Sequence, residues 1–177
     1  MKDLERLKSR IRLIRDFPAK GVLFRDITPL LGNHRDFRNA IGLMHRKFRM
    51  INVDAVAAVE SRGFIIGAPL AVRSNAAFVP IRKAGRLPST KIEATYQLEY
   101  GKQSLEMHVD AIQPGQKVLI VDDVLATGGT SLAACELVER VGGKIIGLAF
   151  LIELSGLGGR EKLKGRRIFS LIKDSRS

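Results

Sequence analysis

Two adjacent carboxylates, Asp122 and Asp123, follow four consecutive apolar residues in the stretch VLIVDDVLATGGT. A core strand normally hides its charges, so the paired aspartates mark the point at which this strand leaves the core. In a parallel sheet that point is the carboxyl end of the strand, where ligands bind. Carboxylates there can accept hydrogen bonds from sugar hydroxyls or hold a hydrated magnesium ion. The pair therefore predicts a polar ligand at the end of a strand over 117–121.

The segment ATGGT, from Ala126 to Thr130, follows the aspartates and leads into a predicted helix. Its small residues, Gly128 and Gly129 above all, let several backbone N–H groups converge on one anion, and the helix dipole favours negative charge there. The hydroxyls of Thr127 and Thr130 add donors. A phosphate beside sugar hydroxyls describes a ribose phosphate. The P-loop and the dinucleotide fingerprint do not fit, and the local alternative is a strand that ends in a capped turn.

Apolar patterning predicts the elements that must position these residues. Runs that are apolar on both faces are typical of buried parallel strands, at 53–59, 77–81, 117–121 and 144–154, with a fifth near 166–172. Helical spacing predicts helices over about 3–15, 36–49, 63–72 and 129–141, with an extended segment at 21–31 between the first two. Strands that alternate with helices predict an α/β fold with a mainly parallel central sheet flanked by helices.

Residues 82–110 depart from that pattern. Gly85, Pro88 and Gly101 interrupt the segment, and its runs KIEATYQLEY and QSLEMHV alternate apolar with polar residues. That alternation predicts an exposed antiparallel hairpin. Because no internal repeat or linker occurs, we expect one domain over residues 1–177 that carries this hairpin as an excursion.

Composition limits the class of protein. The 177 residues are 45% hydrophobic and 27% charged, as in soluble globular proteins, and no apolar run is long enough for a membrane helix. The charged N-terminus is not a secretory signal, and the single cysteine, Cys135, excludes an intrachain disulfide and suits the cytoplasm. The three histidines show no ligand spacing, so no structural metal is expected.

The net charge of +12 is the unusual total. Such a field attracts phosphorylated small molecules or nucleic acid. Because aromatic residues are only 6% and tryptophan is absent, a stacking platform for single strands is not evident. We therefore expect a solvated basic surface and no nucleic-acid partner.

The strand and turn at 118–130 resemble the phosphoribosyl pyrophosphate motif of the type I phosphoribosyltransferases. Other stretches are similar, in the same order, to motifs of the adenine phosphoribosyltransferase family within that class, and together they span about residues 10 to 170. They are DFPAKGVLFRDITPLL, ESRGF, VPIRKAGRLP, YQLEYG, DDVLATGGT and GREKL. The resemblance implies that phosphoribose is transferred from phosphoribosyl pyrophosphate to adenine, giving AMP and pyrophosphate. It also implies Mg²⁺ as cofactor, a homodimer, and a flexible hood hairpin at 82–110.

The resemblance also assigns the residues that bind the donor. The segment Ala126–Thr130 would hold the ribose phosphate, and Asp122 and Asp123 would face the ribose hydroxyls. Mg²⁺ would be bound mainly through the substrate, with the same two aspartates as candidate ligands. Arg62, in ESRGF, would contact the pyrophosphate as a catalytic residue, next to a peptide bond at Glu60–Ser61 that is often cis in the family. Read locally, SRG is only a strand-to-helix turn.

Three further cations and the acceptor's residues follow from the same resemblance. Arg82, Lys83 and Arg86 form a basic loop suited to the pyrophosphate, and in dimeric relatives such a loop reaches the neighbouring subunit's site. The adenine base would lie near Leu23, Phe24 and Arg25, with backbone groups that read the purine edge and an apolar side chain against its face. As a plain charge run the loop would be a solvated surface, and Phe24 alone could be an ordinary core residue.

Glu99 and Tyr100 lie on the hood hairpin. The resemblance makes Glu99 the second catalytic residue, which handles the proton of the purine, while closure of the hood excludes water from a reaction that hydrolysis competes with. Two rival functions remain open. One is the same transfer to hypoxanthine or guanine, although no lysine motif for a 6-oxo group follows the fourth strand. The other is a nucleic-acid-binding regulator, which has no need of the LEYG hood.

Overall fold

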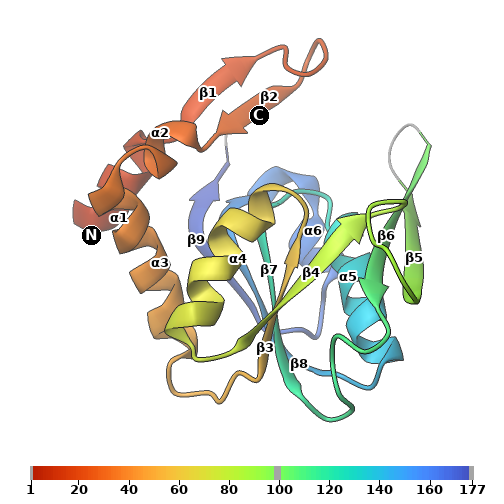
Figure 1. Cartoon of the computed structure of the whole chain (residues 1–177). Helices are drawn as coiled ribbons and strands as arrows, with labels where there is room; N and C mark the ends of the chain where they lie inside the picture. The colour runs from red at the N-terminus through yellow and green to blue at the C-terminus, as the bar shows by residue number, and fades with distance from the viewer. Residues whose placement is uncertain (1, 98–100, 176–177) are drawn as a thin grey trace.

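The computed structural model describes residues 2–97 and 101–175 (Figure 1). Within these ranges seven strands form one sheet, in the order β5-β6-β4-β3-β7-β8-β9. The five strands from β4 to β9 in this order run parallel to one another, whereas β6 is antiparallel to both β4 and β5. Their bounds are β3 Ala55–Val59, β4 Ala77–Lys83, β5 Lys91–Gln97, β6 Lys102–His108, β7 Lys117–Leu125, β8 Lys144–Leu154 and β9 Ile168–Asp174. The predicted α/β class is confirmed.

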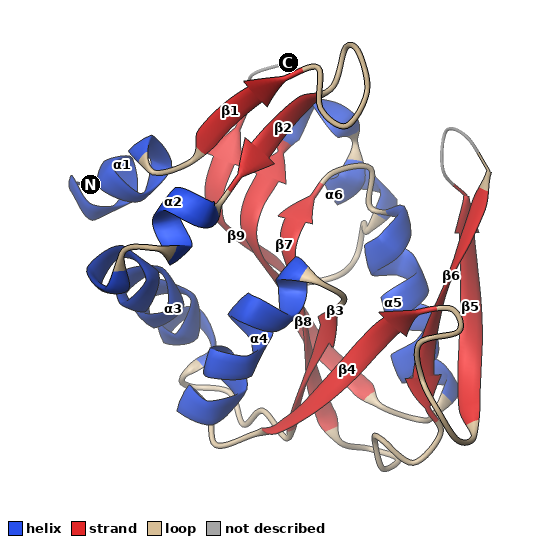
Figure 2. Cartoon of the chain, turned by 45° about the horizontal axis from the view of Figure 1, so that its top comes forward, coloured by secondary structure: helices blue, strands red, loops and turns tan. Residues whose placement is uncertain are grey.

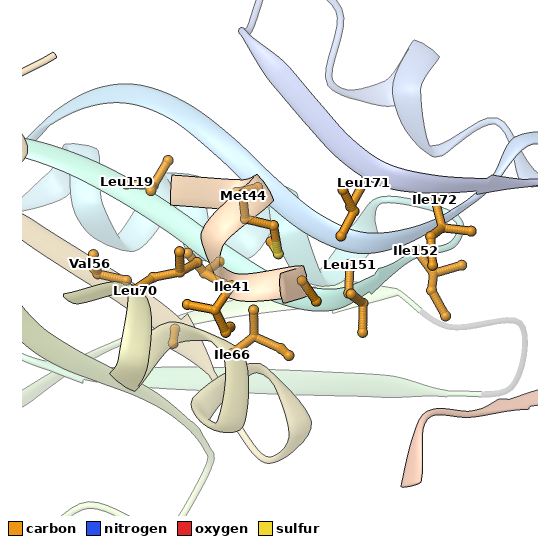
Figure 3. Packing of buried hydrophobic residues seen from close by; sticks show 14 of the residues in the cluster. Ile41, Met44, Val56, Ile66, Leu70, Leu119, Leu151, Ile152, Leu171 and Ile172 are labelled. Carbon is orange, nitrogen blue, oxygen red and sulfur yellow. The ribbon is translucent and has the colours of Figure 1, made fainter. Parts of the chain in front are cut away.

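Helices cover both faces of this sheet. Val56 and Ala58 of β3 belong to one core cluster with α3 (His34–Phe48) and α4 (Arg62–Arg73), which Figure 3 shows from close by. Ala55 and Ala57, the alternate residues, belong to a second cluster with α5 (Gly129–Arg140). Every residue of β3 is buried, because a strand between two helical layers has no solvent-facing side. This explains why its sequence AVAAV lacks polar alternation.

The N-terminal region differs from the prediction. The helix expected over 3–15 is only α1, Lys2–Ser9, and Arg12–Arg15 forms strand β1 instead. It pairs antiparallel with β2, Leu23–Asp26, in a small separate sheet, followed by α2, Thr28–Leu31. Apolar spacing favoured a longer helix, but backbone pairing with a segment that follows a cis Phe17–Pro18 bond decides the conformation.

The strand that carries the aspartates is also longer than predicted. β7 continues past Asp122 and Asp123 to Leu125, because β8 runs on beside it and pairs with Asp122, Val124 and Leu125. The aspartates therefore lie among the last residues of a paired strand and not beyond its end. The expectation that the strand ends at residue 121 was wrong, although the pair does lie near the carboxyl edge of the sheet.

Two hairpins stand above the carboxyl ends of the central strands. Figures 1 and 2 place β1–β2 on the side of α2 and α3, and β5–β6 on the opposite side beside α5. The antiparallel hairpin predicted within 82–110 is present, with Lys91–Gln97 paired to Lys102–His108. Between β8 and β9 lie a short 3₁₀ turn, Ser155–Leu157, and α6, Gly159–Lys162. No helix of the described ranges is both long and apolar enough to cross a bilayer.

Candidate active site

A pocket of about 270 Å³ opens at the carboxyl ends of β3, β4 and β7. Five residues singled out from the sequence meet there: Arg62, Lys83, Asp122, Asp123 and Thr130. Its remaining lining residues come from the end of β3 and from the hairpin: Val59, Glu60, Ser61, Tyr96 and Leu105. The strand order makes this possible, because β3 lies directly between β4 and β7.

The turn from β3 into α4 brings the helix start against the aspartates. Its peptide bond Glu60–Ser61 is cis, as the resemblance implied. A Cβ atom on Gly63 would lie 2.9 Å from Oδ1 of Asp122 and 3.2 Å from the carbonyl oxygen of Val121. Only glycine therefore allows the first turn of α4 to pack so closely on β7. The glycine of the SRG motif is explained by this contact.

The two aspartates form a desolvated pair. Asp123 is buried, and its backbone N–H donates to Oδ1 of Asp122 at 2.8 Å. Burial raises the pKa of Asp122 well above its usual range, and the neighbouring Asp123 charge raises it further. Burial also raises the pKa of Asp123, although the Arg62 guanidinium opposes that shift. Such carboxyl groups interact strongly with hydroxyl groups or cations that enter the pocket, because little water competes.

Arg62 connects the aspartates to the N-terminal hairpin. Its Nε lies 2.6 Å from Oδ2 of Asp123, its Nη1 donates to the Arg25 carbonyl oxygen at 3.4 Å, and its guanidinium lies 4.8 Å from the centre of the Phe24 ring. Within the described chain, Oδ2 of Asp123 accepts no well-aligned hydrogen bond, so its contact with Arg62 is chiefly electrostatic. The oxygen keeps acceptor capacity for a hydroxyl group.

The three residues expected at the base take different positions. Phe24 lies outside the pocket lining but contacts Arg62, which belongs to it, and the Phe24 ring also meets Phe17 edge-on at 5.1 Å. The side chain of Arg25 turns away, because its Nε donates to Asp174 at 2.9 Å and its Nη1 donates to the Leu23 carbonyl oxygen. Arg25 is thus available to the pocket through its backbone and not through its guanidinium. Leu23 is half-buried on the same strand.

The basic loop is also divided. Lys83 lines the pocket, whereas the Arg82 guanidinium donates to both oxygens of Glu60, at 2.9 and 3.3 Å, and to the Arg86 carbonyl oxygen at 2.7 Å. The hydrogen bonds from Arg82 hold the pKa of Glu60 below its usual range. Arg86 is exposed and lies outside the lining. Of the three loop residues predicted to bind the pyrophosphate, only Lys83 lines the same pocket as Arg62.

The segment Ala126–Thr130 forms the turn from β7 into α5, with Thr127 exposed. Gly128 immediately precedes α5 and has φ +79°, a left-handed conformation that glycine adopts readily. A Cβ on Gly129 would lie 3.4 Å from the Tyr96 ring, which places the hairpin against the cradle. Glu99 and Tyr100 lie outside the described residues. Tyr96, which the sequence did not single out, is the hairpin residue that the pocket contains.

A second segment supports the cradle from behind, and its role was missed. A Cβ on Gly128 would lie 2.8 Å from the Gly159 carbonyl oxygen, and a Cβ on Gly159 would overlap the Ala126 carbonyl oxygen. Arg160, the next residue, donates to both oxygens of buried Glu153 at 2.8 and 2.6 Å. These hydrogen bonds lower the pKa of Glu153 to about 2. The motif GREKL was visible in the sequence, but nothing in it revealed this contact.

The donor set limits how a metal can bind. In residues 2–97 and 101–175 no group of three or more His, Cys, Asp or Glu side chains could hold an ion. Two adjacent carboxylates suit Mg²⁺, which keeps several waters and commonly binds through one or two carboxylates together with substrate phosphates. The pocket therefore fits a substrate-bound Mg²⁺ and not a cage made by protein alone.

A parallel α/β sheet with an acidic pair, a glycine turn and a helix start at its carboxyl edge defines a phosphoribosyltransferase, and the model of the phosphoribosyl transferase domain family matches residues 27–174. The adenine phosphoribosyltransferase of Chloroflexus aurantiacus is 53% identical over 166 residues, 94% of this chain and 96% of the relative. That of Halothermothrix orenii is 52% identical, covering 95% and 99%. The crystal structure of adenine phosphoribosyltransferase from Thermoanaerobacter pseudethanolicus superposes with a TM-score of 0.95 at 50% identity, over 97% of this chain and 99% of that one. The chain belongs to the adenine phosphoribosyltransferase family.

Proposed function

We propose that this chain transfers phosphoribose from phosphoribosyl pyrophosphate to adenine, forming AMP and pyrophosphate. The observation that carries the proposal is the single pocket in which the desolvated aspartate pair, Arg62 and the start of α5 meet. Relatives about half identical over almost the whole chain are adenine phosphoribosyltransferases. A further relative, from Saccharomyces cerevisiae, is 38% identical, covers 96% of this chain and 98% of its own with a TM-score of 0.89, and was solved with adenine.

The donor is bound by residues of four elements: β4, α4, β7 and the turn into α5. The backbone of Ala126–Thr130 holds the ribose phosphate, with the hydroxyls of Thr127 and Thr130 as added donors, and Asp122 and Asp123 accept hydrogen bonds from the ribose hydroxyls. Arg62 and Lys83 neutralise the pyrophosphate. Positive charge develops on the ribose as pyrophosphate leaves, so stabilisation of the leaving group supplies much of the rate.

Arg62 has to leave its present contacts for this role. In the structure its guanidinium lies over Phe24 and beside Asp123. A pyrophosphate group carries more negative charge than one aspartate and draws Arg62 toward it. This movement frees both Asp123, for a ribose hydroxyl, and the face of Phe24, for the purine. Leu23 and Arg25 then read the edge of the base through their backbone groups.

The hood hairpin completes the site. Glu99 handles the proton of the purine while its ring nitrogen attacks, and Tyr100 helps the hairpin exclude water. Tyr96, which adjoins Gly129, keeps the hairpin close to the phosphate cradle. Arg82 orients Glu60 beside the cis turn, and Arg86 extends the basic loop toward the pyrophosphate of a neighbouring subunit.

Mg²⁺ belongs to the donor complex. Bound to the pyrophosphate, and through water or directly to Asp122 and Asp123, it would neutralise charge on the leaving group. The chain's own contribution is to hold the two carboxylates next to each other at the pocket. Because burial raises the pKa of both, a cation that binds there stabilises their charged form. Loss of turnover in excess EDTA, restored by Mg²⁺, is the expected result.

A homodimer is part of the proposal. Val72 and Ile65 on α4 and Phe78 on β4 are exposed apolar side chains of adjoining elements, at 81%, 41% and 37%. Burial of such a surface favours association. Sedimentation velocity should give a dimer for the wild type and a smaller species for Val72→Glu.

A turnover assay with phosphoribosyl pyrophosphate and a panel of bases tests the function. We expect AMP from adenine, and kcat/KM at least about 100-fold lower for hypoxanthine and guanine, because a site built to pair with one purine edge leaves polar groups unpaired with another. Preferred turnover of a 6-oxopurine would overturn the choice of base. Absence of turnover together with tight, sequence-selective DNA binding near physiological salt would favour the regulator instead.

A further inference from the structure

A second and larger hollow lies between α1, α3 and α4. We call it the arginine groove; it measures about 600 Å³, and its lining consists of Asp3, Arg6, Arg35, Asp36, Arg38, Asn39, Gly42, Arg46 and Arg73. Its lining and that of the active-site pocket share no residue in the described chain. Helices α1 and α3 lie on the side of the molecule opposite the hairpin β5–β6, and α4 lies between α3 and that hairpin (Figures 1 and 2). Nothing in the proposed transfer reaction uses this surface.

The charges of the groove are not balanced by the protein. Its five arginines face only two aspartates. One of these, buried Asp36, is already engaged by Arg6 at 2.7 Å and by Arg10 at 2.8 Å. Across residues 2–97 and 101–175, the remaining arginines make no ion pair: Arg35, Arg38, Arg46 and Arg73. Like charges gathered in one hollow repel one another and attract a multivalent anion.

Helix geometry aligns these arginines around a glycine. Arg35, Arg38, Gly42 and Arg46 follow at spacings of three, four and four residues, so they share one face of α3. Arg73, from the end of α4, faces the same hollow. Gly42 therefore leaves a place without a side chain in the lining that it shares with these arginines, which we call the notch.

Packing does not require that glycine. A Cβ on Gly42 would have no atom within 4 Å in the described chain, and its backbone is not left-handed. Gly67 in α4 differs, since its Cβ would lie 2.5 Å from that of Ala58. Glycine in a helix interior is less favourable than alanine, so a glycine without a packing reason indicates a need for close approach to the backbone.

We propose that the arginine groove binds an oligophosphate chain, either free inorganic polyphosphate or the phosphate tail of a nucleoside triphosphate. Planar guanidinium groups bind phosphate oxygens through paired hydrogen bonds, and Arg38, Arg46 and Arg73 present three of them to one hollow. Nucleic acid is the less suitable ligand, because none of the described lining residues is aromatic and could stack on a base.

Inorganic tripolyphosphate is the probe, measured by titration calorimetry on the whole protein. We expect saturable binding in addition to any binding at the active site, and Arg38→Ala plus Arg73→Ala should weaken it by about tenfold or more, because two charge-assisted contacts are lost. AMP formation by this variant should stay within about twofold of wild type, because its residues lie outside the pocket that contains Asp122. Hydrogen exchange should show protection of α3 on addition of the probe.

Two further variants separate a site from a general charge effect. Arg49→Ala plus Lys164→Ala removes the same charge from exposed positions outside the groove and should leave the affinity unchanged. Gly42→Ala should raise the melting temperature of the free protein and yet weaken tripolyphosphate binding, because a methyl group fills the notch. A titration with ATP and adenosine identifies the source. Equal affinity for ATP and tripolyphosphate indicates the chain alone, and tighter ATP binding, with none of adenosine, indicates a nucleotide.

Four results would overturn the proposal. The first is that tripolyphosphate shows no saturable binding beyond the active site, and the second is that the control variant Arg49→Ala plus Lys164→Ala loses as much affinity. The third is that hydrogen-exchange protection is confined to residues 122–130. The fourth is that the Arg38/Arg73 variant changes its oligomeric state while the wild type has no affinity for the anion. A short DNA duplex that binds more tightly than tripolyphosphate at matched salt, and loses binding with Arg38 and Arg73, would show that nucleic acid is the ligand instead.

Discussion

The active-site pocket and the arginine groove concentrate charge in opposite ways. At the pocket, Arg62 is held by Asp123, and the neighbouring Arg82 is held by Glu60, which lines the pocket. In the groove, Arg6 is held by Asp36, but Arg35, Arg38, Arg46 and Arg73 make no ion pair within the described chain. The ion pairs therefore order the pocket before its substrates arrive. A substrate that binds to Arg62 must first replace the contact of Arg62 with Asp123. The groove offers charge that only an outside anion can neutralise.

The difference also explains why the two were unequally visible in the sequence. The part of the pocket that holds Asp122, Asp123 and Thr130 is built from a strand, a turn and a helix start that follow one another along the chain, so VLIVDDVLATGGT predicts that part locally. The groove needs α1, α3 and α4 to pack together, and its arginines looked like an ordinary solvated surface. The total of +12 drew attention to charge, but it could not say where the charge gathers.

The largest expected effect comes from removing the charges of the aspartate pair. Asp122→Asn plus Asp123→Asn should lower turnover by at least about 100-fold, because the ribose hydroxyls lose charged hydrogen-bond acceptors and Mg²⁺ loses its carboxylate ligands. The fold should persist, since burial already raises the pKa of both carboxyl groups and neutral amides suit that environment. Steady-state kinetics measure the turnover, and thermal melts show whether the fold persists. Unchanged kinetics would remove the ribose-binding assignment, and the groove variant Arg38→Ala provides a control with normal turnover.

The next effect tests whether the cradle depends on its support. Gly159→Ala places a methyl group against the Ala126 carbonyl oxygen, so the cradle must shift. We expect the KM for phosphoribosyl pyrophosphate to rise about tenfold, with that for adenine nearly unchanged, because a displacement of a fraction of an ångström weakens several phosphate contacts. Gly156→Ala is the matched control, since a Cβ there meets no atom within 4 Å in the described chain and the φ is not positive. An equal rise in both KM values would contradict this role.

Much of the fold followed from residue patterns, and the exceptions have one physical cause. The five parallel strands, α3, α4, α5 and the hairpin were predicted from periodicity. Residues 12–15 and 122–125 were misjudged because pairing with β2 and with β8 fixes them as strands. The contact of Arg62 with Phe24 and that of Gly159 with the cradle join segments far apart in sequence. Local patterns predict elements, and packing between distant elements determines the rest.

A smaller effect concerns stability as a function of pH. Arg160 lowers the pKa of Glu153 to about 2 in the folded protein, below the ordinary glutamate value of 4.5. A carboxyl group with a depressed folded-state pKa contributes stability above its unfolded pKa, and that contribution is lost as pH falls from about 4.5 toward 2. Glu153→Gln should therefore reduce the free energy of unfolding by about 1–3 kcal/mol at pH 7, and by less at pH 3.

Urea unfolding of wild type and Glu153→Gln at several pH values measures this difference. Glu139→Gln is a suitable control, because its ion pair with Arg166 joins side chains that are 49% and 26% exposed and should matter less. A difference between wild type and Glu153→Gln that stays constant down to pH 3 would mean that the Arg160 ion pair is not its source. The active-site support would then rest on packing at Gly159 alone.

The smallest effect is that of Gly42→Ala in the groove, which we compare with Gly63→Ala, at a helix glycine of the active-site region. Gly63→Ala pushes a methyl group to within 2.9 Å of Asp122, so we expect a loss of about 1–3 kcal/mol in stability together with lower turnover. Gly42→Ala meets open space and should instead gain up to about 1 kcal/mol, the helix preference of alanine over glycine. Urea unfolding gives both values. If Gly42→Ala destabilised the protein, packing or backbone conformation would require glycine at this position. The glycine would then no longer indicate that an anion approaches the backbone there.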